Sequence, residues 1–202
     1  MESELTSQDR KRIVKGIRGK YVKVAVNPEG LFKYPTGQAG LEALNYDPEL
    51  IQALPDAVRA SYCGVGNPFI LGPIHKGDAV LDIGCGAGVD TIVAAMMTGP
   101  AGSVSGIEMV PEMLERAMEN LRMMGLKNVT FVDGSAEKLP LPTGSFEVVI
   151  SNGVLNLVID KARALREAFR VLKPAGRLMM ADQILTGELQ DDAKIRVDTW
   201  SK

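Results

Sequence analysis

The sequence contains little cysteine, histidine or tryptophan, and it has no long apolar run. Two cysteines, Cys63 and Cys85, occur in 202 residues, which excludes a disulfide framework and a four-cysteine zinc site. No apolar run reaches the ~20 residues that a membrane-spanning helix needs, and no secretory signal opens the chain. We therefore expect no membrane contact and a cytoplasmic location.

The composition is that of an ordinary globular protein, with 46% hydrophobic and 24% charged residues. The formal charge of −2 is uneven, because residues 1–26 carry seven Lys or Arg against three Asp or Glu. This basic segment allows contact with nucleic acid or a membrane. We favour instead the solvated face of a helix whose apolar side holds Ile13, Val14 and Ile17, and we expect no nucleic-acid partner.

The chain divides into an N-terminal helical extension or lid, residues 1–78, and an α/β core, residues 79–202. In the extension we expect a helix over 8–25, a loop over 26–40 and short helices over 48–54 and 56–62. In the core, apolar strands alternate with helices, which predicts a Rossmann-like, doubly wound and mainly parallel sheet of about five strands. The expected strands are 79–83, 103–107, 128–132, 146–151 and 176–184, and the expected helices are 89–98, 111–124 and 160–172.

The fifth expected strand has few residues after it. Residues 185–202 leave room for one short helix but not for a C-terminal hairpin. An uncovered edge strand recruits a partner. We therefore expect a homodimer through this edge, or cover from the N-terminal helices or the 186–202 tail; a fragment of a longer enzyme is the remaining alternative.

One segment carries the strongest functional signal, Ala79–Asp90 with the sequence AVLDIGCGAGVD. An apolar run ends there in Gly84, Gly86 and Gly88, a helical segment follows, and a second apolar run ends in Glu108. This is the layout of a nucleotide-binding β-α-β unit. In such a unit the glycines let the backbone approach a ligand, and the acidic residue accepts hydrogen bonds from the ribose hydroxyls.

The glycine spacing bears on the choice of nucleotide. A dinucleotide fingerprint needs its last glycine at position 89, which is Val89. The pattern D-x-G-x-G-x-G beginning at Asp82 instead resembles motif I of class I S-adenosylmethionine (SAM) methyltransferases. The resemblance implies SAM as cofactor and a loop that packs along its methionine part.

Other segments agree with this resemblance in the same order. Gly134–Glu137 is similar to the adenine loop of that superfamily, with Ser135 where an Asp is usual and the Ala136 amide left for the ring nitrogen. LPTGSFEVVISN at 141–152 and RVLKPAG at 170–176 resemble two further signatures. The resemblance implies cofactor-binding roles for Asp82, Gly84, Cys85, Gly86, Gly88, Glu108, Met109, Ser135, Ala136 and Asn152.

A narrower resemblance points to the arsenite methyltransferases. It rests on GVGNP at 64–68, Gly88–Asp90 and SNGVLNL at 151–157, where that family carries GCGNP and SNCVINL. Trivalent arsenic bonds to sulfur, yet Val65 and Gly153 stand at the two informative positions. Cys63 lies two residues early, and Cys85 lies in the SAM loop. The resemblance implies a shared fold, and the departures argue against arsenite.

We therefore predict a SAM-dependent methyltransferase that acts on a small-molecule acceptor. Its catalytic residue stays unknown, with Asn152, Asn156 and Tyr62 as candidates to orient the acceptor, whereas His75 is expected in a surface turn. The alternatives are a catalytically weak or inactive truncated SAM-binding protein, an arsenite methyltransferase, and a nicotinamide-dependent oxidoreductase, against which Val89 counts. We expect no metal.

Overall fold

The computed structural model describes residues 5–184 together with Val197 and Trp200. Five parallel strands form one sheet in the order β3-β2-β1-β4-β5, as the alternation of strands and helices predicts. The strands are β1 (Ala79–Ile83), β2 (Ser103–Glu108), β3 (Val129–Asp133), β4 (Phe146–Asn152) and β5 (Leu172–Ala181). The helices of the core are α5 (Val89–Thr98), α6 (Pro111–Met124) and α7 (Lys161–Val171).

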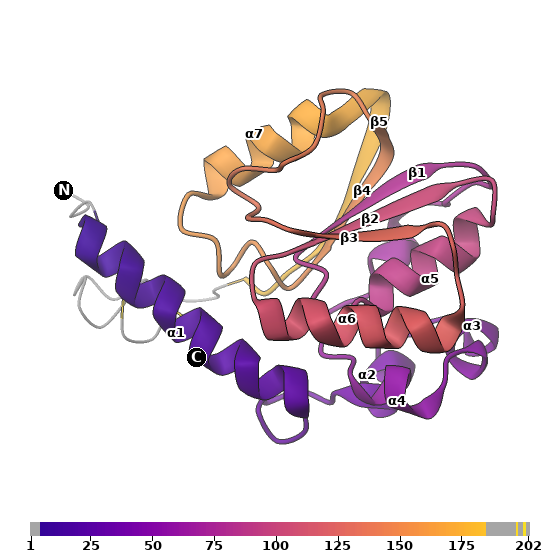
Figure 1. Cartoon of the computed structure of the whole chain (residues 1–202), viewed down its shortest axis with the longest axis horizontal. Coiled ribbons are helices and arrows are strands. Elements are labelled where there is room, and N and C mark those ends of the chain that lie inside the picture. The colour runs from indigo at the N-terminus through magenta and orange to yellow at the C-terminus, as the bar shows by residue number, and fades with distance from the viewer. Residues whose placement is uncertain (1–4, 185–196, 198–199, 201–202) are drawn as a thin grey trace.

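Helices cover both faces of the sheet, with α5 and α6 on one face and α7 on the other (Figure 1). Ala94 and Ala95 of α5 pack on Val80 of β1, while Ala164 and Ala168 of α7 pack on the opposite face. Small residues on the inward helix faces let the helices approach the large apolar strand residues closely. This doubly wound arrangement confirms the expected fold class.

The N-terminal part of the chain is helical, with α1 (Ser7–Val26), α2 (Gly37–Ala43), α3 (Pro48–Ala53), α4 (Asp56–Ala60) and the 3-10 turn η1 (Pro68–Leu71). A capping box between Thr6 and Asp9 starts α1. The expectation of a loop over 26–40 is wrong at its end, because α2 begins at Gly37. Local glycines disfavour a helix there, but complete burial of Leu41 against neighbouring helices outweighs them.

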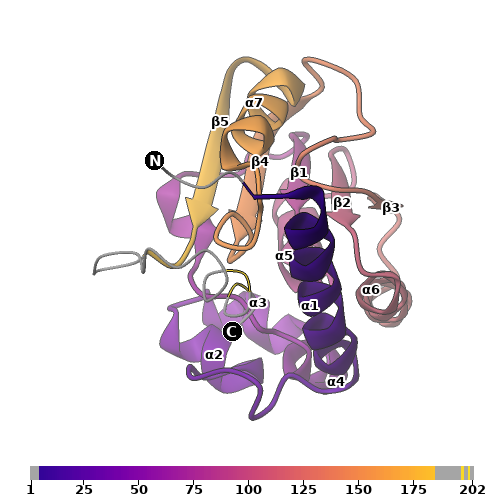
Figure 2. The same cartoon turned by 90° about the vertical axis from the view of Figure 1, so that its left-hand side faces the viewer.

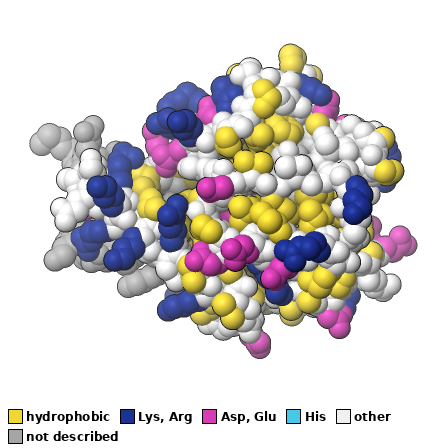
Figure 3. Space-filling view, viewed as in Figure 1, with side chains coloured by type: hydrophobic (Ala, Val, Ile, Leu, Met, Phe, Trp, Pro, Cys, Tyr) yellow, Lys and Arg dark blue, Asp and Glu magenta, His cyan; other side chains and the backbone are white. Residues whose placement is uncertain are grey.

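Helix α1 lies beside the carboxyl ends of the strands and presents its basic face outward (Figures 2 and 3). Ile13 and Ile17 are buried, while Arg10, Lys11 and Lys15 are exposed, as expected for a solvated face. Among the described residues, no helix combines the length and the apolar character needed to cross a membrane.

Strand β5 begins and ends earlier than the expected 176–184. Leu172 already pairs with Phe146, and an irregularity in register follows, with Ala175 at a φ of 64°. The strand therefore accommodates Pro174 at a bulge instead of starting after it. Within the described part of the chain, β5 pairs with β4 and with no strand on its outer side.

The motif RVLKP has a structural role at the start of this strand. The Arg170 guanidinium donates hydrogen bonds to the carbonyls of Leu139 and Leu141 and forms an ion pair with Glu167 at 2.8 Å. These bonds fix the connection that follows β3 against the end of α7. Of the 186–202 tail, only Val197 and Trp200 are described, and both pack near α1 rather than on β5.

Candidate functional site

A cavity opens at the carboxyl ends of the central strands, where doubly wound sheets bind their ligands. Asp82 of β1, Glu108 of β2 and Asn152 of β4 all line it. Helix α1 contributes Val14 and Ile17 from the other side, so the N-terminal extension and the core both line one cavity. Every residue expected to bind the cofactor lines this cavity except Gly88.

The glycine loop after β1 has a conformation that a larger residue would not tolerate. Gly84 has a φ of 70°, and a Cβ there would lie 2.5 Å from the Cγ2 atom of Val154. The amides of Gly84 and Cys85 both donate to the carbonyl of Ile107, at 2.8 and 2.9 Å. The loop is thereby tied to the end of β2, and its backbone forms one wall of the cavity.

Gly88 acts in packing rather than as part of the cavity wall. Its φ is 78°, and a Cβ would lie 2.7 Å from the Phe131 ring and 3.1 Å from the Cβ of Ala117. The missing side chain therefore lets the start of α5 lie directly against β3 and α6. In glycine loops of this kind, the third glycine allows the helix to pack closely on the strand.

Glu108 holds the loop through its carboxylate. Its Oε2 atom accepts from the amide of Gly86 at 3.0 Å, and its Oε1 atom accepts from the amides of Met109 and Val110 at 2.8 and 2.9 Å. Burial raises the pKa of Glu108, and these three bonds oppose that rise. A carboxylate offers about four acceptor positions, so one position on Oε2 remains for a ligand.

Asn152, at the end of β4, joins three distant segments. Its Oδ1 atom accepts from the amides of Val65 and Gly66 at 2.9 and 3.1 Å. Its Nδ2 atom donates to Asp90 at 2.9 Å and to the Gly66 carbonyl at 2.7 Å. The hydroxyl of Tyr46 also donates to Asp90, at 2.7 Å. The side-chain amide thus holds the glycine-rich turn of the extension against the sheet.

The three candidate catalytic residues do not form one group. Tyr62 and Asn152 line the cavity and lie within 3.3 Å of each other. The hydroxyl of Tyr62 lies 3.1 Å from that of Tyr46 and 3.0 Å from the Gly66 carbonyl, so it is used within the chain. Asn156 is not among the residues that line the cavity, and His75 is exposed in the segment before β1, as expected.

The expected adenine loop adjoins the cavity. Ser135 and Ala136 both line it. The Ser135 hydroxyl accepts from the amide of Glu137 at 3.2 Å, and Glu137 in turn accepts from the amides of Ile159 and Asp160. The loop is therefore a preformed turn that is attached to the segment preceding α7.

The cavity is acidic. Asp82, Asp90, Glu108 and Glu137 line it, and none of the described lining residues is Lys, Arg or His. Burial raises the pKa of Asp82 well above its ordinary value, with a further rise from the nearby charge of Asp90. Burial raises the pKa of Asp90 as well, although Tyr46 and Asn152 stabilise its charged form. Such a site favours a ligand that carries positive charge.

Val65 and Gly153 face each other across the glycine-rich turn. A Cβ on Gly153 would lie 3.1 Å from the Cγ1 atom of Val65. The two positions that are informative for arsenic chemistry are therefore neighbours, and neither carries a thiol. Burial raises the pKa of the Cys63 thiol to about 12 and raises that of Cys85 as well, so both cysteines are protonated at neutral pH.

Sequence reasoning missed the lining residues that the extension and the segment after β4 supply. Val14, Ile17 and Tyr21 of α1 line the cavity, as do Leu157 and Ile159. The apolar side of α1 was visible in the sequence, but nothing local indicated which surface it covers. Asp90 also lines the cavity, and its burial beside Tyr46 depends on a contact between segments that are far apart in the chain.

The known proteins that are similar in sequence to this chain include methyltransferases of more than one kind. Residues 74–201 match a family model described as a methyltransferase domain. An arsenite methyltransferase from Halobacterium salinarum is 38% identical over 164 residues, which are 81% of this chain and 42% of the relative. A ubiquinone/menaquinone biosynthesis C-methyltransferase from Pasteurella multocida is 41% identical over 54% of this chain and 41% of its own length.

A solved methyltransferase structure is similar to this chain as well. The crystal structure of an arsenic(III) S-adenosylmethionine methyltransferase from Chlamydomonas reinhardtii is similar with a TM-score of 0.54 and 36% identity. The match covers 74% of this chain and 50% of that chain. The chain spans about half the length of the arsenite methyltransferases that it matches.

The raised pKa of Asp82 predicts how the stability of the ligand-free protein depends on pH. A carboxyl group whose pKa is raised by folding stabilises the native state below its unfolded pKa, and that stabilisation is lost as pH rises through the folded pKa. We expect Asp82→Asn to gain roughly 1–3 kcal/mol in unfolding free energy over the parent protein as pH rises from about 5 to about 8. Urea unfolding at the two pH values measures this.

Asp9→Asn serves as the control of opposite sign. The capping bond with Thr6 lowers the pKa of Asp9. The Asp9 carboxylate therefore stabilises the folded protein fully at pH values well above the pKa of Asp9 in the unfolded chain. We expect this variant to be destabilised equally at both pH values. Identical pH dependences for the parent protein and Asp82→Asn would contradict the assignment of a raised pKa to Asp82.

Proposed function

The chain belongs to the family of S-adenosylmethionine-dependent methyltransferases, and from this we propose that it transfers a methyl group from SAM to a small-molecule acceptor in the cavity beside α1. The observation that carries the proposal is the charge of this cavity. Four carboxyl groups line it, of which Asp82 is largely protonated near neutral pH, and no Lys, Arg or His does so among the described residues. SAM carries a positive sulfonium and a positive ammonium group against a single carboxylate, so it is a net cation.

The same observation disfavours a nicotinamide dinucleotide. Its pyrophosphate is anionic and requires amide groups or cations around it, whereas Asp90 and Glu108 place negative charge near the glycine loop. When SAM is bound, its sulfonium supplies an activated methyl group. The tasks left for the protein are to align the acceptor, which is worth up to ~7–11 kcal/mol, and to exclude water.

The residues present fit this cofactor. The backbone of Gly84 and Gly86 forms the wall that a methionine moiety would follow, and the remaining acceptor position of Glu108 suits a ribose hydroxyl. Ser135 and the amide of Ala136 lie where the adenine ring is expected. Helix α1 covers the cavity with apolar side chains, which limits the entry of water.

We propose that arsenite is not the acceptor, because the chemistry of trivalent arsenic requires thiolates. Val65 and Gly153 replace two thiols at adjacent positions, and both Cys63 and Cys85 are protonated at neutral pH. We propose that the acceptor is a small molecule of another class. A SAM-binding protein without catalytic activity is the second candidate, because the side chains of Tyr62 and Asn152, which were expected to orient an acceptor, are already hydrogen-bonded within the chain.

We further propose that two copies associate through β5. Its outer side has no partner strand in the described part of the chain. Leu178 and Met180 are 38% and 37% exposed, and Phe169 of the neighbouring α7 is 80% exposed. An unpaired edge beside apolar side chains favours pairing with a second copy.

The first prediction concerns the role of Glu108. We expect Glu108→Ala to weaken SAM binding about 10- to 100-fold, because a charge-assisted bond is worth roughly 1.5–3 kcal/mol and the three loop amides lose their common partner. Isothermal titration calorimetry measures the affinity. The control is Asp133→Ala, at the end of the adjacent β3 but exposed and outside the cavity; unchanged SAM affinity in Glu108→Ala would sink the assignment.

The second prediction concerns arsenite. Purified protein with SAM and a thiol reductant should yield no methylated arsenic, measured by chromatography coupled to mass spectrometry. The double variant Val65→Cys/Gly153→Cys should gain affinity for trivalent arsenic over Val65→Cys alone, because two adjacent thiols chelate and one does not. Methylated arsenic from the unaltered protein would refute the proposal.

The third prediction concerns the β5 edge. Light scattering should give the mass of a dimer, and Met180→Lys should shift it toward the monomer because a charge blunts the edge. Val26→Lys, at a residue of α1 that is 83% exposed, should leave the dimer intact. A monomer whose β5 amides exchange as slowly as those of β1 would exclude the dimer.

A further inference from the structure

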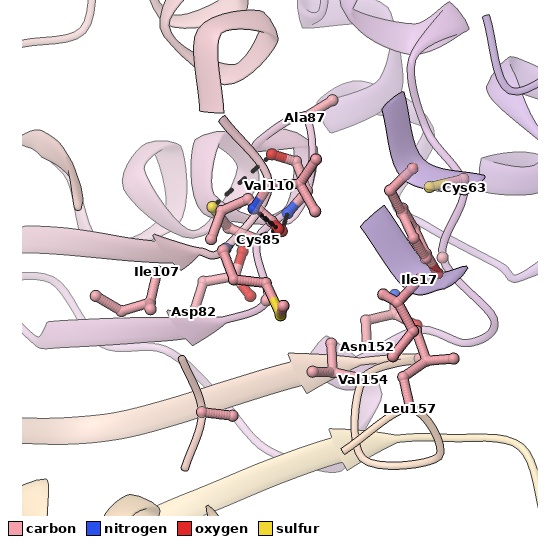
Figure 4. Close-up of a pocket in the computed structure, with 18 of the residues that line it drawn as sticks. Ile17, Cys63, Asp82, Cys85, Ala87, Ile107, Val110, Asn152, Val154 and Leu157 are labelled. Carbon is pink, nitrogen blue, oxygen red and sulfur yellow. Dashed lines mark hydrogen bonds between the residues drawn. The ribbon is translucent and has the colours of Figure 1, made fainter. Parts of the chain in front are cut away.

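The cavity has two chemically different walls. Figure 4 shows Cys85 and Val110 on one side, with the loop after β1 and the end of β2. Ile17 of α1 and Cys63 lie across the cavity from them, and Leu157 lies near Ile17. The first wall contains the groups suited to SAM, which leaves the second wall for the acceptor.

The second wall is apolar and uncharged. Helix α1 contributes Val14 and Ile17, and the segment after β4 contributes Val154 and Leu157. The wall is also anchored, because Ile17 packs with Leu157 and Tyr21 in one cluster. An acceptor lying against these side chains would be held by the burial of apolar surface.

Tyr21 is the polar side chain that α1 contributes to this wall, whereas Asn152, which lies near Ile17 (Figure 4), is already bonded within the chain. Tyr21 lines the cavity, and its hydroxyl has no hydrogen-bond partner among the described residues. Tyr34 differs, because its hydroxyl donates to the carbonyl of Cys63 at 3.2 Å. Burial raises the pKa of Tyr21, so the group stays a neutral hydroxyl that can donate a hydrogen bond to a ligand.

We propose that α1 forms the acceptor site, that the acceptor is an uncharged and largely apolar molecule bearing a hydroxyl or carbonyl oxygen, and that Tyr21 positions it through that oxygen. This rests on the proposed function. An anionic acceptor is disfavoured because the charged carboxylates of the cavity would repel it and no lining cation among the described residues would offset that repulsion. Tyr21 is a positioning and specificity residue, with no part in proton transfer.

The test uses a matched pair of probes, neutral 1-naphthol and anionic 1-naphthoate, with the protein saturated with S-adenosylhomocysteine. Fluorescence titration should show 1-naphthol binding and at least about tenfold weaker binding of 1-naphthoate. Tyr21→Phe should weaken 1-naphthol about 3- to 10-fold through loss of one hydrogen bond. It should leave the affinity for S-adenosylhomocysteine and the melting temperature unchanged.

Tyr34→Phe is the matched control, because it removes a hydroxyl that is already engaged within the chain; 1-naphthol affinity should then stay within about twofold. The inference is overturned if 1-naphthoate binds as well as 1-naphthol, if 1-naphthol fails to bind the saturated protein, or if both variants behave alike. These results leave the proposed cofactor intact. Failure of S-adenosylhomocysteine itself to bind would instead overturn the proposed function, and this inference with it.

Discussion

The side-chain amide of Asn152 holds the site together. It bonds the amides of Val65 and Gly66, the carbonyl of Gly66 and the carboxylate of Asp90. These partners belong to the N-terminal extension and to the start of α5, which lie 86 and 62 residues away in the chain. Without this amide, the partly buried amides of Val65 and Gly66 would lose their acceptor, and leaving a partly buried polar group unpaired is costly. The position of the turn, and hence of Val65 opposite Gly153, depends on this contact.

The buried carboxylates are the second constraint on the site. Asp82 accepts from the hydroxyl of Thr91 at 2.6 Å, and Asp90 accepts from Tyr46 and Asn152. These bonds stabilise each charge in part, yet the pKa of both groups stays raised because burial dominates. Glu108 adds a third carboxylate that is bound to backbone amides. A cationic ligand would relieve this concentration of negative charge, so the site gives up some stability of the ligand-free protein in favour of cofactor affinity.

The main chemical difference from the arsenite methyltransferases lies at positions 65 and 153. The scaffold keeps the turn and strand end that bring positions 65 and 153 together, with a valine methyl in the space that a Cβ on Gly153 would approach. An apolar contact thus stands where adjacent thiols would chelate a soft ion. On the opposite side of the same cavity, α1 supplies apolar residues and one hydroxyl.

The sequence alone determined the order of strands and helices from Ala79 onward, because buried parallel strands are continuous apolar runs and because proline and glycine mark the helix ends. It also determined the glycine loop and Glu108, since the β-α-β layout requires those residue types at that spacing. It failed for α2, where burial of Leu41 outweighed local glycines, and for β5, where a bulge accommodates Pro174. Only the tertiary structure decided that Gly88 packs on Phe131, that Asn156 lies outside the cavity, and that Tyr21 lines it. Each of these depends on contacts between segments far apart in the chain, which local patterns of residues do not specify.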